Sequence, residues 1–337
     1  MLAVTQTAIP TRRDCLQALL VGTLGVGAAL ANAQSPAPGV EDDTWTDTAR
    51  KRDVPVRVRW PQSDRHNAAL PVVLFSHGLG GTRDGGTVWG EAWAAAGFVV
   101  VHIQHPGSDL AAVSRTATSF SDKAGLRVAA GAAQLLARLQ DVGFVLNQIS
   151  LRHAARQGRW ATARHGAVGM SGHSFGAHTT LGMAGQRYPG FEGISEPRLA
   201  SFIAFSPTVP SVGDAQQAFG RLSRPVLTLT GTRDDDVLGN GATPDKRIAV
   251  FPALPSSGKA QLVLQDADHM TFGGQTGRAA EIVPRESVTR DQQARDHALV
   301  AAITTDWWRA TLLDDADARA RLIAPAGLRP GDRWQQK

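Results

Sequence analysis

The chain has 337 residues, of which 42% are hydrophobic and 19% are charged. This composition is typical of a globular protein rather than a disordered one, and the length allows one α/β domain with a large core. The net charge of +5 comes from scattered Lys and Arg residues and not from a basic run, so the sequence does not predict a nucleic-acid partner.

The N-terminal segment resembles an export signal. Arg12 and Arg13 lie in a twin-arginine-like motif, a mildly apolar stretch follows, and residues 31–33 fit an A-x-A cleavage site. We therefore expect residues 1–33 to be an export signal and the mature protein to be periplasmic or secreted, with the general export route as the alternative to the twin-arginine route. The apolar stretch is too short and too rich in glycine to predict a stable membrane span.

The mature chain would contain no cysteine, because Cys15 is the only one and lies within the expected signal. A disulfide framework, a thiolate nucleophile and a cysteine metal site are thereby excluded. Residues 34–44 are rich in Pro, Gly, Ser and acidic residues, and they predict a flexible linker before the folded domain.

Short apolar runs recur along the rest of the chain and indicate β-strands. Residues 54–60 alternate in the manner of a half-buried strand. Continuous apolar runs, typical of buried parallel strands, occupy residues 72–75, 98–103, 167–170, 202–205, 225–230 and 262–264. Helical spacing favours helices over residues 89–96, 126–149, 177–186 and 290–313, with a long loop over 105–125. This alternation predicts an α/β fold whose mostly parallel central sheet has helices on both faces.

One pentapeptide, Gly172-His173-Ser174-Phe175-Gly176, follows a predicted strand and precedes a predicted helix. Strand, G-x-S-x-G and helix form the context of the nucleophile elbow of an α/β-hydrolase. A sharp turn there raises the serine hydroxyl above the sheet edge. Glycines on either side leave room for the turn, because a Cβ would collide with the neighbouring strand or helix. The alternative interpretation is a tight turn with a structural role only.

A serine hydroxyl needs a base, and the base needs an orienting acid. In this fold the acid follows the serine in the chain and stands at the carboxyl end of a strand. Asp234 meets both conditions, and we favour it over the adjoining Asp235 and Asp236. Unpaired buried charge is costly, so only one of the three carboxylates is expected to turn inward. A solvated acidic turn or a helix N-cap is the alternative for this cluster.

The predicted base is His269, which follows the last predicted strand. His297 is the other histidine beyond the acidic cluster, but it lies in the middle of a predicted helix. There are two alternatives: His269 is a surface histidine, or it forms a metal site with Asp266 and Asp268.

Two backbone N–H groups are expected to stabilise the oxyanion. The first belongs to Phe175, the residue after the nucleophile. For the second we favour Leu79, in the glycine-rich loop that follows the predicted strand 72–75. A phosphate-binding loop would need a different glycine pattern, which is not present at this position.

Residues 75–80 and 172–176 resemble the platelet-activating factor acetylhydrolases, which belong to the α/β-hydrolase superfamily. Residues 47–60 and 138–142 resemble bacterial proteins called predicted dienelactone hydrolases. The resemblance implies that residues 45–337 form an α/β-hydrolase catalytic domain of a serine esterase that uses no cofactor and no metal. The acetylhydrolases favour short acyl groups.

Two features depart from these families. Dienelactone hydrolases use a cysteine nucleophile, whereas this elbow carries Ser174. In the acetylhydrolases the acid follows the sixth strand, but residues 203–207 contain no carboxylate. The acid is therefore assigned to Asp234, after the next strand, and the phospholipid specificity of the acetylhydrolases is not transferred to this protein.

The sequence thus predicts a serine carboxylic-ester hydrolase that works through an acyl-enzyme on short- to medium-chain esters. An exported hydrolase of polyesters or lipids is a second hypothesis, in which residues 105–125 and 207–218 shape the pocket. A non-catalytic binding protein on the same scaffold is a third, and acyl transfer or peptidase activity also stays open. The expected ligand is a small-molecule or polymeric ester.

Overall fold

The computed structural model describes residues 39–62, 69–119 and 122–337. The expected export signal, with Cys15, lies outside the described residues, as do residues 34–38 of the expected linker. Residues 40–44, the last part of that linker, belong instead to a β-strand that is hydrogen-bonded along its whole length to the next one. Trp45 is the buried residue of this strand, and its exposed acidic side chains explain the linker-like composition.

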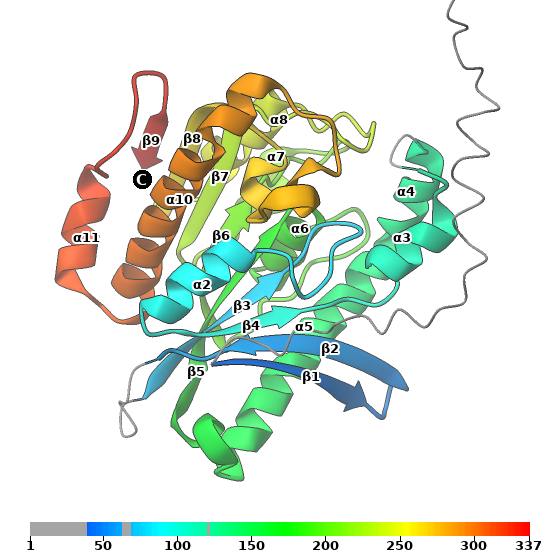
Figure 1. Cartoon of the computed structure of the whole chain (residues 1–337), viewed down its shortest axis with the longest axis vertical. Helices are drawn as coiled ribbons and strands as arrows, with labels where there is room; N and C mark the ends of the chain where they lie inside the picture. Colours follow the sequence, from blue (N-terminus) through cyan, green and yellow to red (C-terminus); the bar gives the residue numbers. More distant parts are fainter. Residues whose placement is uncertain (1–38, 63–68, 120–121) are drawn as a thin grey trace, which may run out of the picture. The chain divides into compact units, whose positions relative to one another are not determined.

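The described residues form one nine-stranded sheet in the order β1-β2-β4-β3-β5-β6-β7-β8-β9 (Figure 1). The strands are β1 Val40–Asp47, β2 Arg52–Arg59, β3 Leu70–Ser76, β4 Val99–Ile103, β5 Ala163–His173, β6 Leu199–Phe205, β7 Val226–Arg233, β8 Lys259–Asp268 and β9 Arg333–Gln336. The six strands from β4 to β8 run parallel, whereas β1, β2 and β9 pair antiparallel at the edges. The mostly parallel sheet predicted from the sequence is therefore confirmed.

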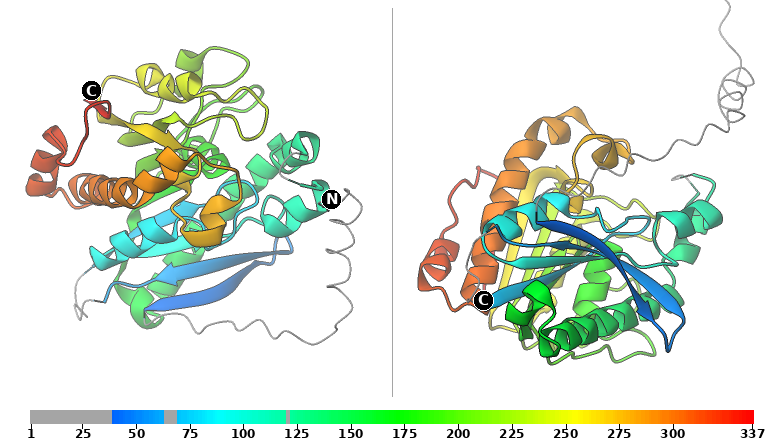
Figure 2. Two further views of the ribbon diagram at one scale, coloured as in Figure 1. Left: turned by 45° about the horizontal axis from the view of Figure 1, so that its top comes forward. Right: turned by 60° about the horizontal axis from the view of Figure 1, so that its bottom comes forward.

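Helices cover both faces of the sheet (Figures 1 and 2). They are α2 Thr87–Ala95, α3 Leu110–Thr116, α4 Lys123–Ala129, α5 Ala132–Ala154, α6 Phe175–Met183, α7 Ala215–Phe219, α8 Pro244–Ile248, α9 Val250–Ala253, α10 Ser287–Leu312 and α11 Ala316–Ile323. One core lies between the sheet and α5 and α6, and a second lies between the sheet and α2 and α10.

The side chains of each buried strand point alternately into the two cores. In β3, Val72 and Leu74 enter the core under α5, whereas Val73 and Phe75 enter the core under α10. Successive side chains of a strand point to opposite faces, so a strand covered on both sides must be apolar throughout. All seven residues of β3 are buried, which accounts for the continuous apolar run in the sequence.

Three features differ from the sequence-based prediction. The expected loop over residues 105–125 contains α3 and the start of α4, both with an aspartate at the N-cap. The expected helix over 126–149 is two helices, because the chain turns at Ala130 and Gly131. Beyond α10, α11 and β9 extend the fold, and β9 adds an antiparallel edge to β8. None of the helices in the described part of the chain combines the length and the apolar character that crossing a bilayer requires.

Candidate active site

Ser174 lies between β5 and α6 in a strained backbone conformation. Its φ is 56° and its ψ is −113°, a region that L-residues with a side chain rarely adopt. A Cβ on Gly172 would lie 2.4 Å from the carbonyl oxygen of Gly176, and one on Gly176 would lie 1.9 Å from that of Ser76. The elbow therefore requires both glycines for the predicted steric reason, and it leaves Ser174 half-buried at the carboxyl end of the sheet.

The structure brings Asp234 and His269 together. Asp234 directly follows β7 and is fully buried, and His269 directly follows β8 and is 5% exposed. The Nδ1–H of His269 donates to Oδ1 of Asp234 at 2.7 Å. Because a carboxylate only accepts, this bond fixes the tautomer in which Nδ1 carries the proton and Nε2 has a free lone pair.

The other candidates have different environments. Asp235 is exposed, and the Asp236 carboxylate accepts backbone N–H groups of its own turn. His297, on α10, donates through Nε2 to the carbonyl of Thr271 at 3.0 Å, and this hydrogen bond gives His297 a structural role. Of the three aspartates, Asp234 is the one that turns inward.

Arg247 on α8 is a neighbour of Asp234 that the sequence did not reveal. Its guanidinium is buried, and its Nε lies 2.9 Å from Oδ1 of Asp234 and 2.8 Å from the Asp234 carbonyl oxygen. Thr230 donates its hydroxyl to Oδ2 at 2.8 Å. Burial alone raises the pKa of Asp234, but the charge of Arg247 and the interaction with His269 outweigh burial and hold that pKa well below its usual range. The carboxylate is thus ionised at neutral pH.

His173 fixes the backbone of His269. Its ring lies 4.6 Å from the His269 ring, centre to centre, and its Nε2–H donates to the His269 carbonyl at 3.0 Å. Burial, with the neighbouring His269, lowers the pKa of His173 far below its usual range, so this ring is neutral. The elbow residue before the serine therefore positions the loop that carries the predicted base.

The loop after β3 runs beside the nucleophile. A Cβ on Gly78 would lie 3.5 Å from the Cβ of Ser174, which shows how closely the loop approaches. Gly80 N–H donates to the Ser108 carbonyl at 2.9 Å, and Gly81 N–H donates to the Gly78 carbonyl. Leu79, which precedes Gly80 in this loop, is half-buried and lines a cavity together with Ser174. Phe175 begins α6, where the first N–H groups have no acceptor within the helix.

Comparisons with known proteins agree with this fold. The family model for platelet-activating factor acetylhydrolase, isoform II, matches residues 50–127, which include the loop after β3 and end before Ser174. The crystal structure of 2,6-dihydroxy-pseudo-oxynicotine hydrolase superposes with a TM-score of 0.50 at 15% sequence identity, covering 82% of this chain and 68% of that one. The chain has the α/β-hydrolase fold. Both comparisons lead to hydrolases, and no curated protein matches the sequence.

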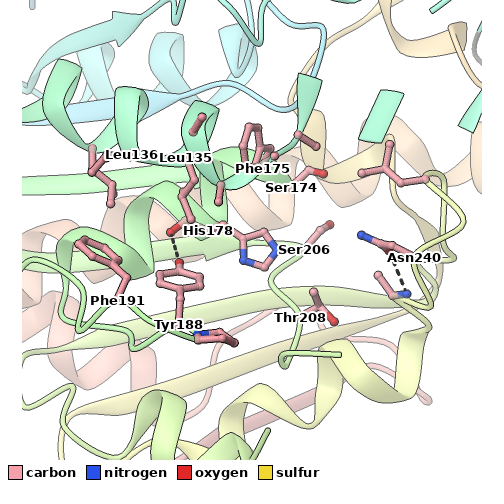
Figure 3. Close-up of a pocket in the computed structure, with 18 of the residues that line it drawn as sticks. Leu135, Leu136, Ser174, Phe175, His178, Tyr188, Phe191, Ser206, Thr208 and Asn240 are labelled. Carbon is pink, nitrogen blue, oxygen red and sulfur yellow. Dashed lines mark hydrogen bonds between the residues drawn. The ribbon is translucent and has the colours of Figure 1, made fainter. Parts of the chain in front are cut away.

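This fold places Ser174 where two cavities meet. One cavity, of about 720 Å³, lies between α5, the start of α6 and residues 188–191 (Figure 3). The other, of about 90 Å³, is lined by Leu79, Ser174, His269 and neighbouring residues. Ser174 and His269 therefore both line the small cavity. Within residues 39–62, 69–119 and 122–337, no group of three or more His, Cys, Asp or Glu side chains could hold a metal ion.

A buried arginine connects the two segments expected to supply the oxyanion hole. Arg138 on α5 is fully buried and donates to the carbonyl of His77, in the loop after β3. Its Nε donates to the hydroxyl of Thr179 on α6 at 2.9 Å, and its guanidinium carbon lies 4.6 Å from the ring centre of Phe175. Burial lowers the pKa of Arg138 to about 9, so its charge persists at neutral pH. The sequence carried no signal for this contact beyond the family resemblance of residues 138–142.

A second serine, histidine and aspartate meet under the same loop. Ser76 Oγ lies 3.0 Å from His105 Nε2, and His105 Nδ1–H donates to Asp141 at 3.0 Å. All three are fully buried, so no substrate reaches them. Burial, reinforced by the charge of Arg138, lowers the pKa of His105 to about 4, and the ring is neutral. This arrangement is structural: it is closed to solvent, and Ser76 ends a regular strand whereas Ser174 stands on a strained elbow.

We expect the Asp141→Asn variant to lose about 3–5 kcal/mol of unfolding free energy at pH 7, because it breaks a buried ion-pair cluster. Asp141 accepts from Arg50 at 2.8 Å and from Arg52 at 2.7 Å, as well as from His105. Burial alone raises the pKa of Asp141, but the bonds from His105 and Arg52 outweigh burial and lower it to about 2.

Since the folded-state pKa lies below the unfolded value of about 3.9, the carboxylate stabilises the fold above pH 4 and loses this effect between pH 4 and pH 2. Urea denaturation of both proteins across this range should show the difference narrowing as the pH falls. Equal stability at pH 7 would contradict the assigned role.

Proposed function

We propose that this protein is a serine carboxylic-ester hydrolase that works through an acyl-enzyme on short- to medium-chain esters. The observation that carries the proposal is the buried Asp234–His269 hydrogen bond beside a serine on a strained elbow. Metabolic, structural and binding proteins can share this fold, so the argument rests on the site and not on the fold.

Each group has a role in the proposed reaction. Nε2 of His269 accepts the hydroxyl proton of Ser174 as Oγ attacks the ester carbonyl carbon. The carbonyl π electrons move to oxygen, and the N–H groups of Leu79 and Phe175 stabilise that oxyanion. When the oxyanion collapses, the bond to the alcohol oxygen breaks and His269 gives its proton to the alcohol. Water then attacks the acyl-enzyme with His269 again as the base, and the acid and free Ser174 are released.

Asp234 and Arg247 act on the imidazole rather than on the substrate. Asp234 holds His269 in the reactive tautomer and stabilises the imidazolium that forms after proton transfer. Arg247 holds the Asp234 carboxylate in place at 2.9 Å, and the lowered pKa of Asp234 keeps it ionised. The proposed base therefore has a charged, fully buried orienting partner.

A fluorophosphonate probe tests the proposal directly. We expect the probe to form a covalent adduct on Ser174, located by mass spectrometry of peptides, and to abolish hydrolysis of p-nitrophenyl butyrate in proportion to labelling. The nucleophile reacts because His269 removes its proton, so His269→Ala should label far more slowly. Ser76, buried next to His105, is the internal control and should carry no adduct. Unlabelled Ser174 in an otherwise folded protein would favour a non-catalytic binding role.

A further inference from the structure

The two cavities that meet at Ser174 differ in size and in lining. The larger has about 720 Å³ and the smaller about 90 Å³. They share Ser174, Val237 and Leu238, so the segment after Asp234 separates them at the nucleophile. An ester bound at Ser174 therefore has two unequal spaces for its two halves.

The larger cavity has mainly apolar walls (Figure 3). Leu135 and Leu136 of α5 face Phe191 across it, and Phe175 closes the end near the nucleophile. The hydroxyl of Tyr188 at its wall already donates to the carbonyl of His178 at 2.7 Å. Such a lining favours a flexible apolar chain, whose burial is driven by the hydrophobic effect.

Two charged side chains also line the larger cavity, and both are engaged with the protein. Arg247 pairs with Asp234 and donates to the Ser206 carbonyl at 2.7 Å. The carboxylate of Asp236 accepts the N–H groups of Leu238 and Gly241, and these bonds help to lower its pKa against the effect of burial. A charged group on the substrate would have to compete with these partners.

The smaller cavity contains the proton donor for the leaving group. His269 lines it together with Gly78 and Leu79, and the apolar side chains of Met270 and Ile282 limit it. Among the described residues that line the larger cavity, His269 does not occur. His269 therefore borders the small cavity and not the large one.

Chemistry assigns the two halves of the ester to these spaces. The tetrahedral carbon carries the Ser174 oxygen, the oxyanion, the alcohol oxygen and the acyl chain. The alcohol oxygen must lie next to His269, which protonates it as the bond breaks. The alcohol consequently occupies the small cavity, and the acyl chain is directed into the large one.

We infer that the substrates are esters of a medium-length apolar acyl group with a small alcohol. This inference rests on the proposed function, because it uses His269 as the acid and Ser174 as the nucleophile. It differs from the short-acyl preference that the family resemblance implied.

Two isomeric esters provide the sharpest test. Methyl octanoate and heptyl acetate have the same atoms and similar overall hydrophobicity, but they place the long chain on opposite sides of the ester. Initial rates of acid release, measured by pH-stat below the solubility limit, give kcat/KM for each. We expect methyl octanoate to be preferred by about tenfold or more, because several methylenes enter a fitting pocket only on the acyl side. Equal values, or a preference for heptyl acetate, would overturn the inference.

Three matched substitutions test which cavity holds the chain. Leu136 lines the large cavity and is 45% exposed, and Ile282 lines the small one and is 42% exposed, so aspartate at either position is compatible with folding. We expect Leu136→Asp to lower the ratio of methyl octanoate to heptyl acetate turnover about tenfold, and Ile282→Asp to raise that ratio. Leu151→Asp, on the same helix as Leu136 but 61% exposed and outside both cavities, is the control and should leave the ratio unchanged.

The outcomes separate the two proposals. If neither ester is hydrolysed by the wild type, or if Ser174→Ala hydrolyses both as fast, the proposed function fails and the inference fails with it. If both are hydrolysed only when Ser174 is present, but Leu136→Asp leaves the ratio unchanged, the proposed function stands and the assignment of the acyl chain to the large cavity is wrong.

Discussion

His269→Ala is expected to lower kcat for p-nitrophenyl butyrate by about 10⁶-fold, the magnitude typical of removing the base of such a triad. The reason is cooperative: without the imidazole, no base removes the proton of Ser174 during acylation or the proton of the attacking water during hydrolysis of the acyl-enzyme. Ser174→Ala should lower kcat by about the same factor, and the double variant should be no slower than either single variant. Stopped assays at high enzyme concentration, on protein free of wild-type contamination, measure the residual rates.

Asp234→Asn should lower kcat less, by about 10⁴-fold, because it leaves the nucleophile and base in place but favours the wrong tautomer of His269. His297→Asn is the matched histidine control, since His297 donates to the Thr271 carbonyl and is not among the described residues that line either cavity. Its turnover should stay within a few-fold of the wild type. A loss at His297 as large as that at His269, or fully additive losses at Ser174 and His269, would contradict the assigned roles.

Arg138→Met should lower kcat by about 10²–10³-fold with little change in KM, the loss typical of one misplaced oxyanion donor. The guanidinium donates to Ser76 Oγ at 3.1 Å and to Ser108 Oγ at 2.9 Å, as well as to the His77 carbonyl. Methionine fills much of the volume but leaves these buried acceptors without donors. The unfolding free energy should therefore fall by about 3 kcal/mol or more, as measured by urea denaturation.

A positional role for Arg138 is distinguishable from a purely structural one. A trifluoromethyl ketone, which forms a tetrahedral adduct with an oxyanion, should lose affinity in Arg138→Met in proportion to kcat/KM, whereas a ground-state competitor should not. Arg138→Lys should recover little of the lost kcat/KM. One ammonium group cannot replace the planar guanidinium, which donates to both the loop after β3 and α6. Arg115→Met, at an exposed position on α3, is the control. Unchanged inhibitor affinity in folded Arg138→Met would refute the positioning role.

The sequence was sufficient for the parallel core of the fold. Runs such as residues 72–75 are apolar at every position because both faces of β3 are covered, and this requirement is visible without coordinates. The edges were harder to predict. β1 carries acidic residues on its exposed side and β9 has four residues of which none is buried, so neither has the composition of a buried strand. Pairing with β2 and β8 specifies them, and pairing partners are not written in local sequence.

The elbow was predictable for the same kind of reason. Gly172 and Gly176 are required by backbone contacts within a few residues of Ser174 and at the end of β3, and a motif of fixed spacing encodes such local constraints. The carboxyl ends of parallel strands lie at one edge of the sheet, so the sequence alone predicts that Asp234 and His269 lie near the serine.

Long-range polar contacts were decided only by tertiary structure. Arg247 reaches Asp234 from a helix 13 residues further along the chain, and Arg138 reaches His77 across 61 residues. Isolated arginines have no periodicity and no motif, because a long side chain can satisfy its donors from many backbone positions. The same holds for the two cavities, whose volumes depend on how α5 packs against residues far from it in the chain. Sequence by itself thus indicated which groups are proposed to react, whereas the packed structure decided what holds these groups in place and how large the two cavities beside Ser174 are.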